Sequence, residues 1–151
     1  MSELITEEAR AWIGRSARPQ RVEVNRSDII KYSVATEQRA EKYLRGDEAP
    51  PMFLAGILRP LVPLDQLGPD GIAEDSFKPD LPLKRVMAGG HDSIFHRPVK
   101  PGEILFATRS LADMYEKQGA SGPLIFLVYN IKVVTEKGEA VMEEKQTRIF
   151  R

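Results

Sequence analysis

The sequence predicts an α+β fold in which a curled antiparallel β-sheet wraps around one central apolar helix. The second half of the chain consists of strand-like segments separated by turn signals, and it holds no helical pattern. Ahead of these strands, residues 51–58 are apolar on every side and begin with a proline suited to a first helical position, which predicts a buried helix. A doubly wound α/β fold would need strands that alternate with helices, so the order of segments argues against it.

Four observations predict the elements of the first half. A capping threonine, Thr6, and two glutamates predict a short helix that Gly14 ends. The alternating text QRVEVN predicts a strand over residues 20–25. After it, Ser27–Asp28 read as a cap, and helical spacing continues from there to Leu44, where glycine and the pair Pro50–Pro51 break it.

The second half begins with a long loop and continues as strands. Residues 59–84 hold five prolines with several glycines and acids, a composition that predicts a long excursion loop after the central helix. Alternation and turn signals then predict a meander of four strands. These strands are expected at residues 85–96, 104–116, 123–135 and 139–150. In the second of them, Leu105, Ala107, Arg109 and Leu111 share one face.

Composition limits the class of protein. The 151 residues carry 22 Lys+Arg against 22 Asp+Glu and are 42% hydrophobic, which predicts a single soluble domain over residues 1–151. The interspersed charges argue against nucleic acid or a membrane surface as a partner. The absence of cysteine excludes disulfides and a catalytic thiol and favours a cytoplasmic location. We expect neither an export signal nor a membrane span, because no long apolar run occurs.

Three pieces of text carry a resemblance to a known family. They are VEVNRSDIIKYSVAT, APPMFLAG, and the segment from FHRPVKPGE to the late hairpin VVTEKGEAVMEE. Their order and spacing resemble the hot-dog domains of MaoC-like dehydratases and (R)-specific enoyl-CoA hydratases over residues 10–150. The resemblance implies a hot-dog fold that dimerises edge to edge. It also implies a role in fatty acid metabolism, in chemistry on acyl thioesters carried by coenzyme A or acyl carrier protein, with no other cofactor.

The sequence departs from the family at the catalytic signature. In active members, Asp-x-Asn-Pro-x-His follows the first helix of the domain, and its Asp and His share the water that adds to the double bond. Hydration needs such a base and acid, and a donor to the thioester carbonyl. Here the corresponding residues 36–43 read TEQRAEKY, without the signature. The resemblance therefore implies a signature-less unit, with no catalytic residue of its own, that shapes the acyl pocket for a catalytic hot-dog partner.

Three functions remain open from the sequence. The first is a non-catalytic acyl-binding subunit of an (R)-specific 2-enoyl-thioester hydratase or 3-hydroxyacyl-thioester dehydratase, whose partner carries the signature. The second is a homodimeric hot-dog module that binds acyl-CoA without catalysis. The third is a self-sufficient hydratase that takes an atypical acid and base from Glu37, Glu41 or His91. Against the third, Glu37 and Glu41 also fit the solvated face of an ordinary helix, with Glu41 paired to Arg45.

The candidate substrate-binding residues fall into three groups. By resemblance, the start of the central helix lines an acyl tunnel. A glycine pair followed by a histidine offers close backbone approach to a ligand, and two cations beside a proline turn suit coenzyme A phosphates or an acidic carrier protein. We predict no metal site, since two histidines without cysteines make zinc improbable. The substrate-binding candidates are Met52, Phe53 and Gly56; Gly89, Gly90 and His91; and Arg97 and Lys100.

Overall fold

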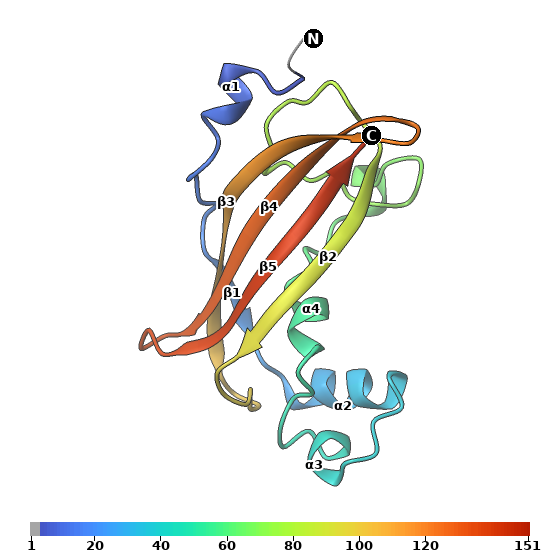
Figure 1. Cartoon of the computed structure of the whole chain (residues 1–151). Coiled ribbons are helices and arrows are strands. Elements are labelled where there is room, and N and C mark those ends of the chain that lie inside the picture. Colours follow the sequence, from blue (N-terminus) through green and yellow to red (C-terminus); the bar gives the residue numbers. More distant parts are fainter. Residues whose placement is uncertain (1–3) are drawn as a thin grey trace.

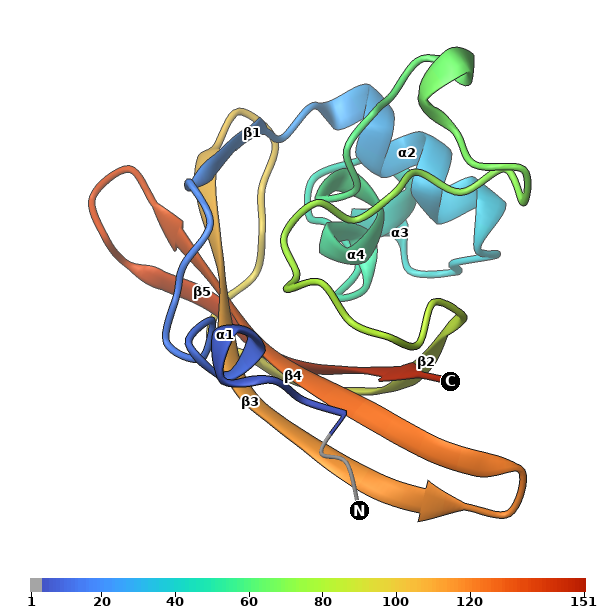
Figure 2. The same ribbon diagram turned by 90° about the horizontal axis from the view of Figure 1, so that it is seen from above.

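A five-stranded antiparallel sheet organises the computed structural model, which describes residues 4–151 (Figure 1). The strands lie in the order β1-β3-β4-β5-β2. The sheet curves around the helical segment in its concave side, as Figure 2 shows, so the predicted α+β architecture is confirmed. The strand bounds are β1 Gln20–Glu23, β2 Val86–Phe95, β3 Ile104–Gly119, β4 Gly122–Thr135 and β5 Ala140–Phe150.

The predicted meander is wrong for one of its four strands. β3, β4 and β5 pair in sequence order, but β2 pairs with β5 at the far edge and not with β3, its neighbour in sequence. Residues 96–103 make this possible, because eight residues readily span the three inter-strand spacings, about 14 Å, that separate β2 from β3. As a result, β2 is an edge strand whose outer side has no partner among residues 4–151.

The helices are shorter than the sequence predicts. Thr6 caps α1 (Glu7–Arg10) as expected, with its hydroxyl accepting from the Ala9 N–H at 3.1 Å. The single helix expected up to Leu44 is wrong, because α2 (Arg26–Ala35) and α3 (Glu41–Leu44) are separate elements. The N-cap of α2 is Asn25, not Ser27–Asp28.

The break between α2 and α3 lies where the catalytic signature would stand. Glu37 takes a positive φ of 55°, and the Gln38 N–H bonds the Ser33 carbonyl at 2.9 Å, which turns the chain out of the helix. Glu37 and Glu41 therefore do not lie one turn apart on a common helix. The pairing of Glu41 with Arg45 is confirmed at 3.1 Å.

The central helix α4 (Phe53–Ile57) packs only one side against the sheet. Phe53 and Leu54 are buried in an apolar cluster on the concave face, whereas Met52 is 48% exposed and Gly56 is exposed as well. A helix that is apolar all round was expected to be enclosed. The structure corrects this expectation, because one side of α4 is open. The apolar cluster includes Val22, Ile29, Leu105, Ala107, Val133 and Met142.

A second apolar cluster lies toward the other end of the concave face, and polar side chains separate the two. Its members are Ile5, Ala9, Leu81, Leu111, Met114, Ile125, Leu127, Tyr129 and Phe150. Between Met142 of the first cluster and Phe150 of the second, the inward positions of β5 are Glu144, Gln146 and Arg148. We call these three residues, with Arg109 of β3, the polar belt.

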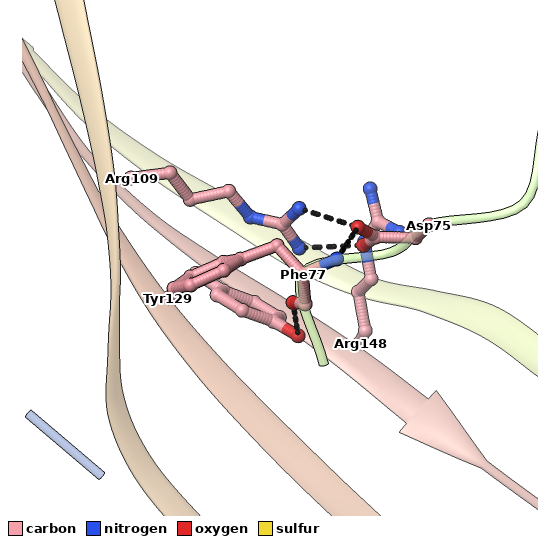
Figure 3. A network of polar contacts seen from close by, with 5 residues as sticks. All are labelled: Asp75, Phe77, Arg109, Tyr129 and Arg148. Atoms are coloured by element: carbon pink, nitrogen blue, oxygen red, sulfur yellow. Dashed lines mark hydrogen bonds and ion pairs between the residues drawn. The ribbon is translucent and has the colours of Figure 1, made fainter. Parts of the chain in front are cut away.

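Asp75 fastens the long loop to this belt (Figure 3). Its carboxylate accepts two hydrogen bonds from Arg109, at 3.0 and 2.8 Å, and one from Arg148 at 2.7 Å. Nearby, the Tyr129 hydroxyl donates to the Phe77 carbonyl at 3.0 Å, and the Arg109 guanidinium lies 3.7 Å from the centre of the Tyr129 ring. The loop, whose one helical turn in the described residues is η1 (Leu64–Gln66), is thereby held over the sheet.

The same contacts set two pKa values. Burial acts to raise the pKa of Asp75, but its hydrogen bond with Arg109 and the charges of Arg109 and Arg148 outweigh burial, so the pKa lies below its usual value. For Tyr129, burial dominates and raises the pKa to about 12, against the opposing effect of the Arg109 charge. Asp75 is therefore ionised and Tyr129 protonated at neutral pH.

The Asp75→Asn variant tests this anchor. The depressed pKa means that folding favours the ionised carboxylate. Its stabilisation is thus present above the unfolded-state pKa of about 3.9 and is lost as the pH falls through the lower folded-state value. We expect Asp75→Asn to lower the free energy of unfolding by about 3 kcal/mol at pH 7, because two arginines lose a half-buried counter-charge.

Urea unfolding at pH 7 and pH 3 measures the effect, and the difference from the wild type should shrink at pH 3. Asp80→Asn is the matched control, since that loop aspartate pairs with Lys84 in full exposure and its loss should leave the midpoint unchanged. A loss of stability that is equal at both pH values would contradict this role for Asp75.

Candidate functional site

The position of the family signature contains no acid–base pair in this chain. Residues 36–40 form the exposed turn after α2, in which the Thr36 hydroxyl donates to the Tyr32 carbonyl at 2.8 Å and the Gln38 amide donates to Thr36. Glu37 and Glu41 are exposed, and neither contacts a histidine in the described part of the chain. The geometry therefore gives no support to a hydratase that uses these two glutamates.

The three candidate wall residues do not form one surface. Phe53 points into the core, where its ring meets the Tyr32 ring edge-on at 5.7 Å. Met52 and Gly56 lie on the open side of α4, where a Cβ added at Gly56 would meet no atom within 4 Å. The open side of α4 is thus accessible and apolar, with room at Gly56.

A cleft of about 280 Å³ opens beside the start of α4. It runs between residues 48–51 with Leu54 on one side and the end of β2 with residues 96–99 on the other. Phe95 contributes an exposed aromatic ring to it. The cleft therefore links the central helix to the edge strand of the sheet. A second and larger cavity, of about 620 Å³, lies away from α4, between α1 and residues 79–84.

The two candidate cations differ in their surroundings. Arg97 lines the cleft, but it forms an ion pair with Glu103 and lies 3.4 Å from Glu139, so its charge is already compensated. The exposed side chain of Lys100 has no ion-pair partner among residues 4–151. Of the two, Lys100 is the cation that remains available to an anionic ligand.

His91 belongs to a polar cluster that the sequence did not reveal. Its Nδ1 lies 3.0 Å from one carboxylate oxygen of Glu144, and the hydroxyl of Ser93 donates to the other oxygen at 2.8 Å. Glu144 is a buried charged residue, only 8% exposed, while the His91 side chain is 43% exposed. A buried carboxylate thus holds an accessible imidazole on the concave face of the sheet.

The glycine pair ahead of His91 explains this placement. β2 has a bulge between Ala88 and Gly90, after which His91 faces Gln146 and Ser93 faces Glu144. With regular alternation from Ala88 and no bulge, His91 would lie on the convex face. Gly89 allows the close approach, because a Cβ there would lie 2.9 Å from the Thr147 side chain, and Gly90 supplies the φ of 129°.

The second histidine provides a contrast within the same chain. Nε2 of His96 lies 2.9 Å from Glu143, but Glu143 is 45% exposed. Glu143 and Glu144 are neighbours on β5 and therefore point to opposite faces of the sheet. Only the His91 pair lies on the concave face beside the core.

Sequence reasoning chose Gly89, Gly90 and His91 but missed Glu144, Ser93, Asp75 and Arg148. A signal was present for Glu144, because β5 alternates and its inward row from Met142 to Phe150 is interrupted by polar residues. Asp75 gave no signal, because it lies in a loop whose path over the sheet depends on tertiary contacts.

Residues 4–151 contain no group of three or more His, Cys, Asp or Glu placed to hold a metal ion. In the same residues, no helix has the length and apolar character needed to cross a membrane.

Comparison with known proteins places the chain in a family. Residues 11–144 match the family described as the FAS1-like, dehydratase domain region. The mesaconyl-C(4)-CoA hydratase of Chloroflexus aurantiacus is 25% identical over 142 residues, which cover 93% of this chain and 50% of that protein. The chain therefore spans about half the length of this curated relative.

Solved structures agree on the fold. The ChsH1–ChsH2 complex of Mycobacterium tuberculosis matches with a TM-score of 0.67 and 20% identity, over 89% of this chain and 88% of the matched one. The HadBC (3R)-hydroxyacyl-ACP dehydratase complex of the same organism matches with a TM-score of 0.63 and 18% identity, over 91% and 96%. These matches, with the curled sheet around α4, confirm the hot-dog fold. The chain belongs to the FAS1-like dehydratase domain family, as its resemblance to MaoC-like dehydratases predicted.

Proposed function

We propose that this chain is the acyl-binding hot-dog subunit of a 2-enoyl-thioester hydratase or 3-hydroxyacyl-thioester dehydratase, and that a second hot-dog subunit supplies the catalytic Asp and His. One observation carries the proposal. The chain has the family's fold around the signature position, yet the turn at residues 36–40 holds no Asp–His pair. Hydration needs a base for water and an acid for the α-carbon, so these groups must come from elsewhere.

The length of the relative supports a partner with the same fold. A hydratase twice as long as the matched region has room for a second domain of this size. Two of the structural neighbours are described as complexes of two components, ChsH1–ChsH2 and HadBC. A division of one enzyme between two hot-dog units, fused in some proteins and separate in others, accounts for both observations.

The edge strand β2 offers the surface for this partner. Its ten residues are almost entirely exposed, and its outer backbone groups have no partner strand in the described part of the chain. A long edge that also exposes apolar side chains is a template for pairing with another sheet. The exposed apolar residues of β2 are Val86, Met87, Ile94 and Phe95. A second copy of this chain would fit the same edge, and a homodimeric acyl-CoA-binding module is therefore the alternative.

The open side of α4 and the neighbouring cleft suit the acyl thioester. Met52 and Gly56 give an accessible apolar surface, and the cleft at the start of the same helix reaches Phe95, at the edge where the partner would add. Lys100 is the cation available for coenzyme A phosphates or for an acidic carrier protein. In this arrangement the chain binds the acyl group and the partner performs the proton transfers.

A hydration assay tests the division of labour. We expect the purified chain alone to leave the absorbance of crotonyl-CoA unchanged, and a mixture with the hot-dog protein that carries Asp-x-Asn-Pro-x-His to consume it. The partner alone is the control and should be slower than the mixture. Hydration by this chain alone would show that the argument from residues 36–40 is wrong.

The Ile94→Asp variant tests the edge. Ile94 is 58% exposed on β2, and a buried, unpaired carboxylate at an interface costs several kcal/mol. We expect this variant to lower the oligomeric mass in light scattering, or to abolish co-purification with the partner. Ile13→Asp is the matched control, because Ile13 is 40% exposed but precedes Gly14, whose N–H bonds Leu111 of β3 at 2.8 Å, and β4 and β5 separate β3 from β2. Equal effects of the two variants would contradict an interface at β2.

The Gly56→Phe variant tests the acyl surface. The added ring occupies open space at α4, so the melting temperature should not fall. It should block the acyl group and weaken binding of crotonyl-CoA about tenfold, as measured by calorimetry. Val34→Phe, at an exposed position of α2, is the control and should bind normally. Unchanged affinity in Gly56→Phe would remove α4 from the binding surface.

A further inference from the structure

The cluster of His91, Ser93 and Glu144 has the features of a built hydrogen-bonding site. Glu144 is more than nine-tenths buried, and both of its carboxylate oxygens are occupied, one by His91 and one by Ser93. A buried carboxylate paired in this way fixes the orientation of its histidine. The imidazole is therefore held in one orientation through Nδ1, and its second nitrogen, Nε2, stays available for another hydrogen bond.

The free nitrogen of His91 defines the chemistry of the site. In a neutral ring whose Nδ1–H donates to Glu144, Nε2 is a hydrogen-bond acceptor. Nε2 has no partner among residues 4–151, and the side chain is accessible. The site consequently selects a ligand group that donates a hydrogen bond, such as a hydroxyl.

The position of the cluster connects it to the proposed acyl surface. Met142 is two residues before Glu144 on the inward side of β5, about 7 Å away along the strand, and it packs in the same apolar cluster as Phe53 of α4. On the neighbouring strand, Phe95 lines the cleft and lies on the same inward side of β2 as Ser93 and His91, so a ligand in the cleft can place a polar group near His91. The bulge at Gly89–Gly90 turns His91 toward this side of the sheet.

We propose that His91, held by Glu144 and Ser93, is a specificity-determining subsite whose Nε2 accepts a hydrogen bond from the hydroxyl group of a bound 3-hydroxyacyl thioester. The proposal rests on the acyl-binding function proposed above, and it assigns to this chain the recognition of the hydroxylated form of the substrate. His91 acts here in binding, and the proton transfers of the reaction remain with the partner subunit.

Calorimetric titration with three probes tests the subsite. The probes are (R)-3-hydroxybutyryl-CoA, crotonyl-CoA, which lacks the hydroxyl, and free coenzyme A, which lacks the acyl group. We expect His91→Phe to weaken binding of the hydroxyacyl probe about fivefold, the effect of one hydrogen bond, and to change the other two less than about twofold. His91→Gln, whose amide oxygen can accept, should recover part of the loss.

Glu143→Gln is the matched control, because it alters the other histidine–glutamate pair from the outer face and Glu143 does not line the cleft. It should leave all three affinities unchanged. The ring ¹⁵N signals of His91 are followed separately, in a His96→Phe variant whose only histidine is His91. We expect Nδ1 to carry the proton and the Nε2 signal to shift with the hydroxyacyl probe and not with crotonyl-CoA.

The possible outcomes separate this inference from the proposed function. A wild type that binds none of the probes would overturn both. Binding of crotonyl-CoA with no effect of His91→Phe on the hydroxyacyl probe would overturn the subsite alone. An equal loss for all three probes would also overturn it, since His91 would then contact the coenzyme A part or act structurally. Unchanged melting temperatures of both His91 variants establish that binding is what the titrations report.

Discussion

The carboxylate of Asp75 holds the middle of this structure together. Two arginines on the concave face of one sheet would repel each other, and their charges would be costly to bury between the apolar clusters on either side. A single half-buried aspartate from the loop binds both, so the loop covers the sheet at that point. The stacked Arg109 and Tyr129, and the bond from Tyr129 to Phe77, extend the same attachment along the loop. A loop with five prolines therefore has a defined path without regular structure.

With the loop fixed in this way, a cleft stays open at the end of β2. It joins the start of α4 to Phe95, at the exposed edge of the sheet. An isolated hot-dog unit buries only part of its apolar residues, and we propose that the remainder marks the places where a ligand and a second unit bind. His91 lies on the same strand, β2, on the inward side that also carries Phe95.

Features of the fold that follow from strand alternation and composition can be predicted from the sequence. Features that depend on tertiary contacts cannot. The inward row of β3, with Leu105, Ala107 and Leu111, follows from the period of two, and all three residues are buried. The end of α2 does not follow, because TEQRAEKY contains good helix formers and the turn arises from local bonds at Ser33 and Glu37. The pairing of β2 with β5 could not be predicted either. No local sequence signal shows whether residues 96–103 form a hairpin between adjacent strands or cross the end of the sheet to a more distant strand. For the site, Gly89 and Gly90 could be found as a glycine pair, but the bulge they form requires the packing of Thr147.

The pair Glu143 and Glu144 shows why burial, and not residue type, identifies a site. Each glutamate contacts one histidine at about the same distance, and strand alternation sends one to the outer face and the other to the core side. On the outer face, water screens the pair and little stability depends on it. On the inner face, an ionised carboxylate costs several kcal/mol to bury, and an apolar residue of similar size would serve packing equally well. Stability alone therefore gives no reason for Glu144 at this position. The proposed recognition of a polar group on an otherwise apolar ligand, through the imidazole that Glu144 holds, gives such a reason.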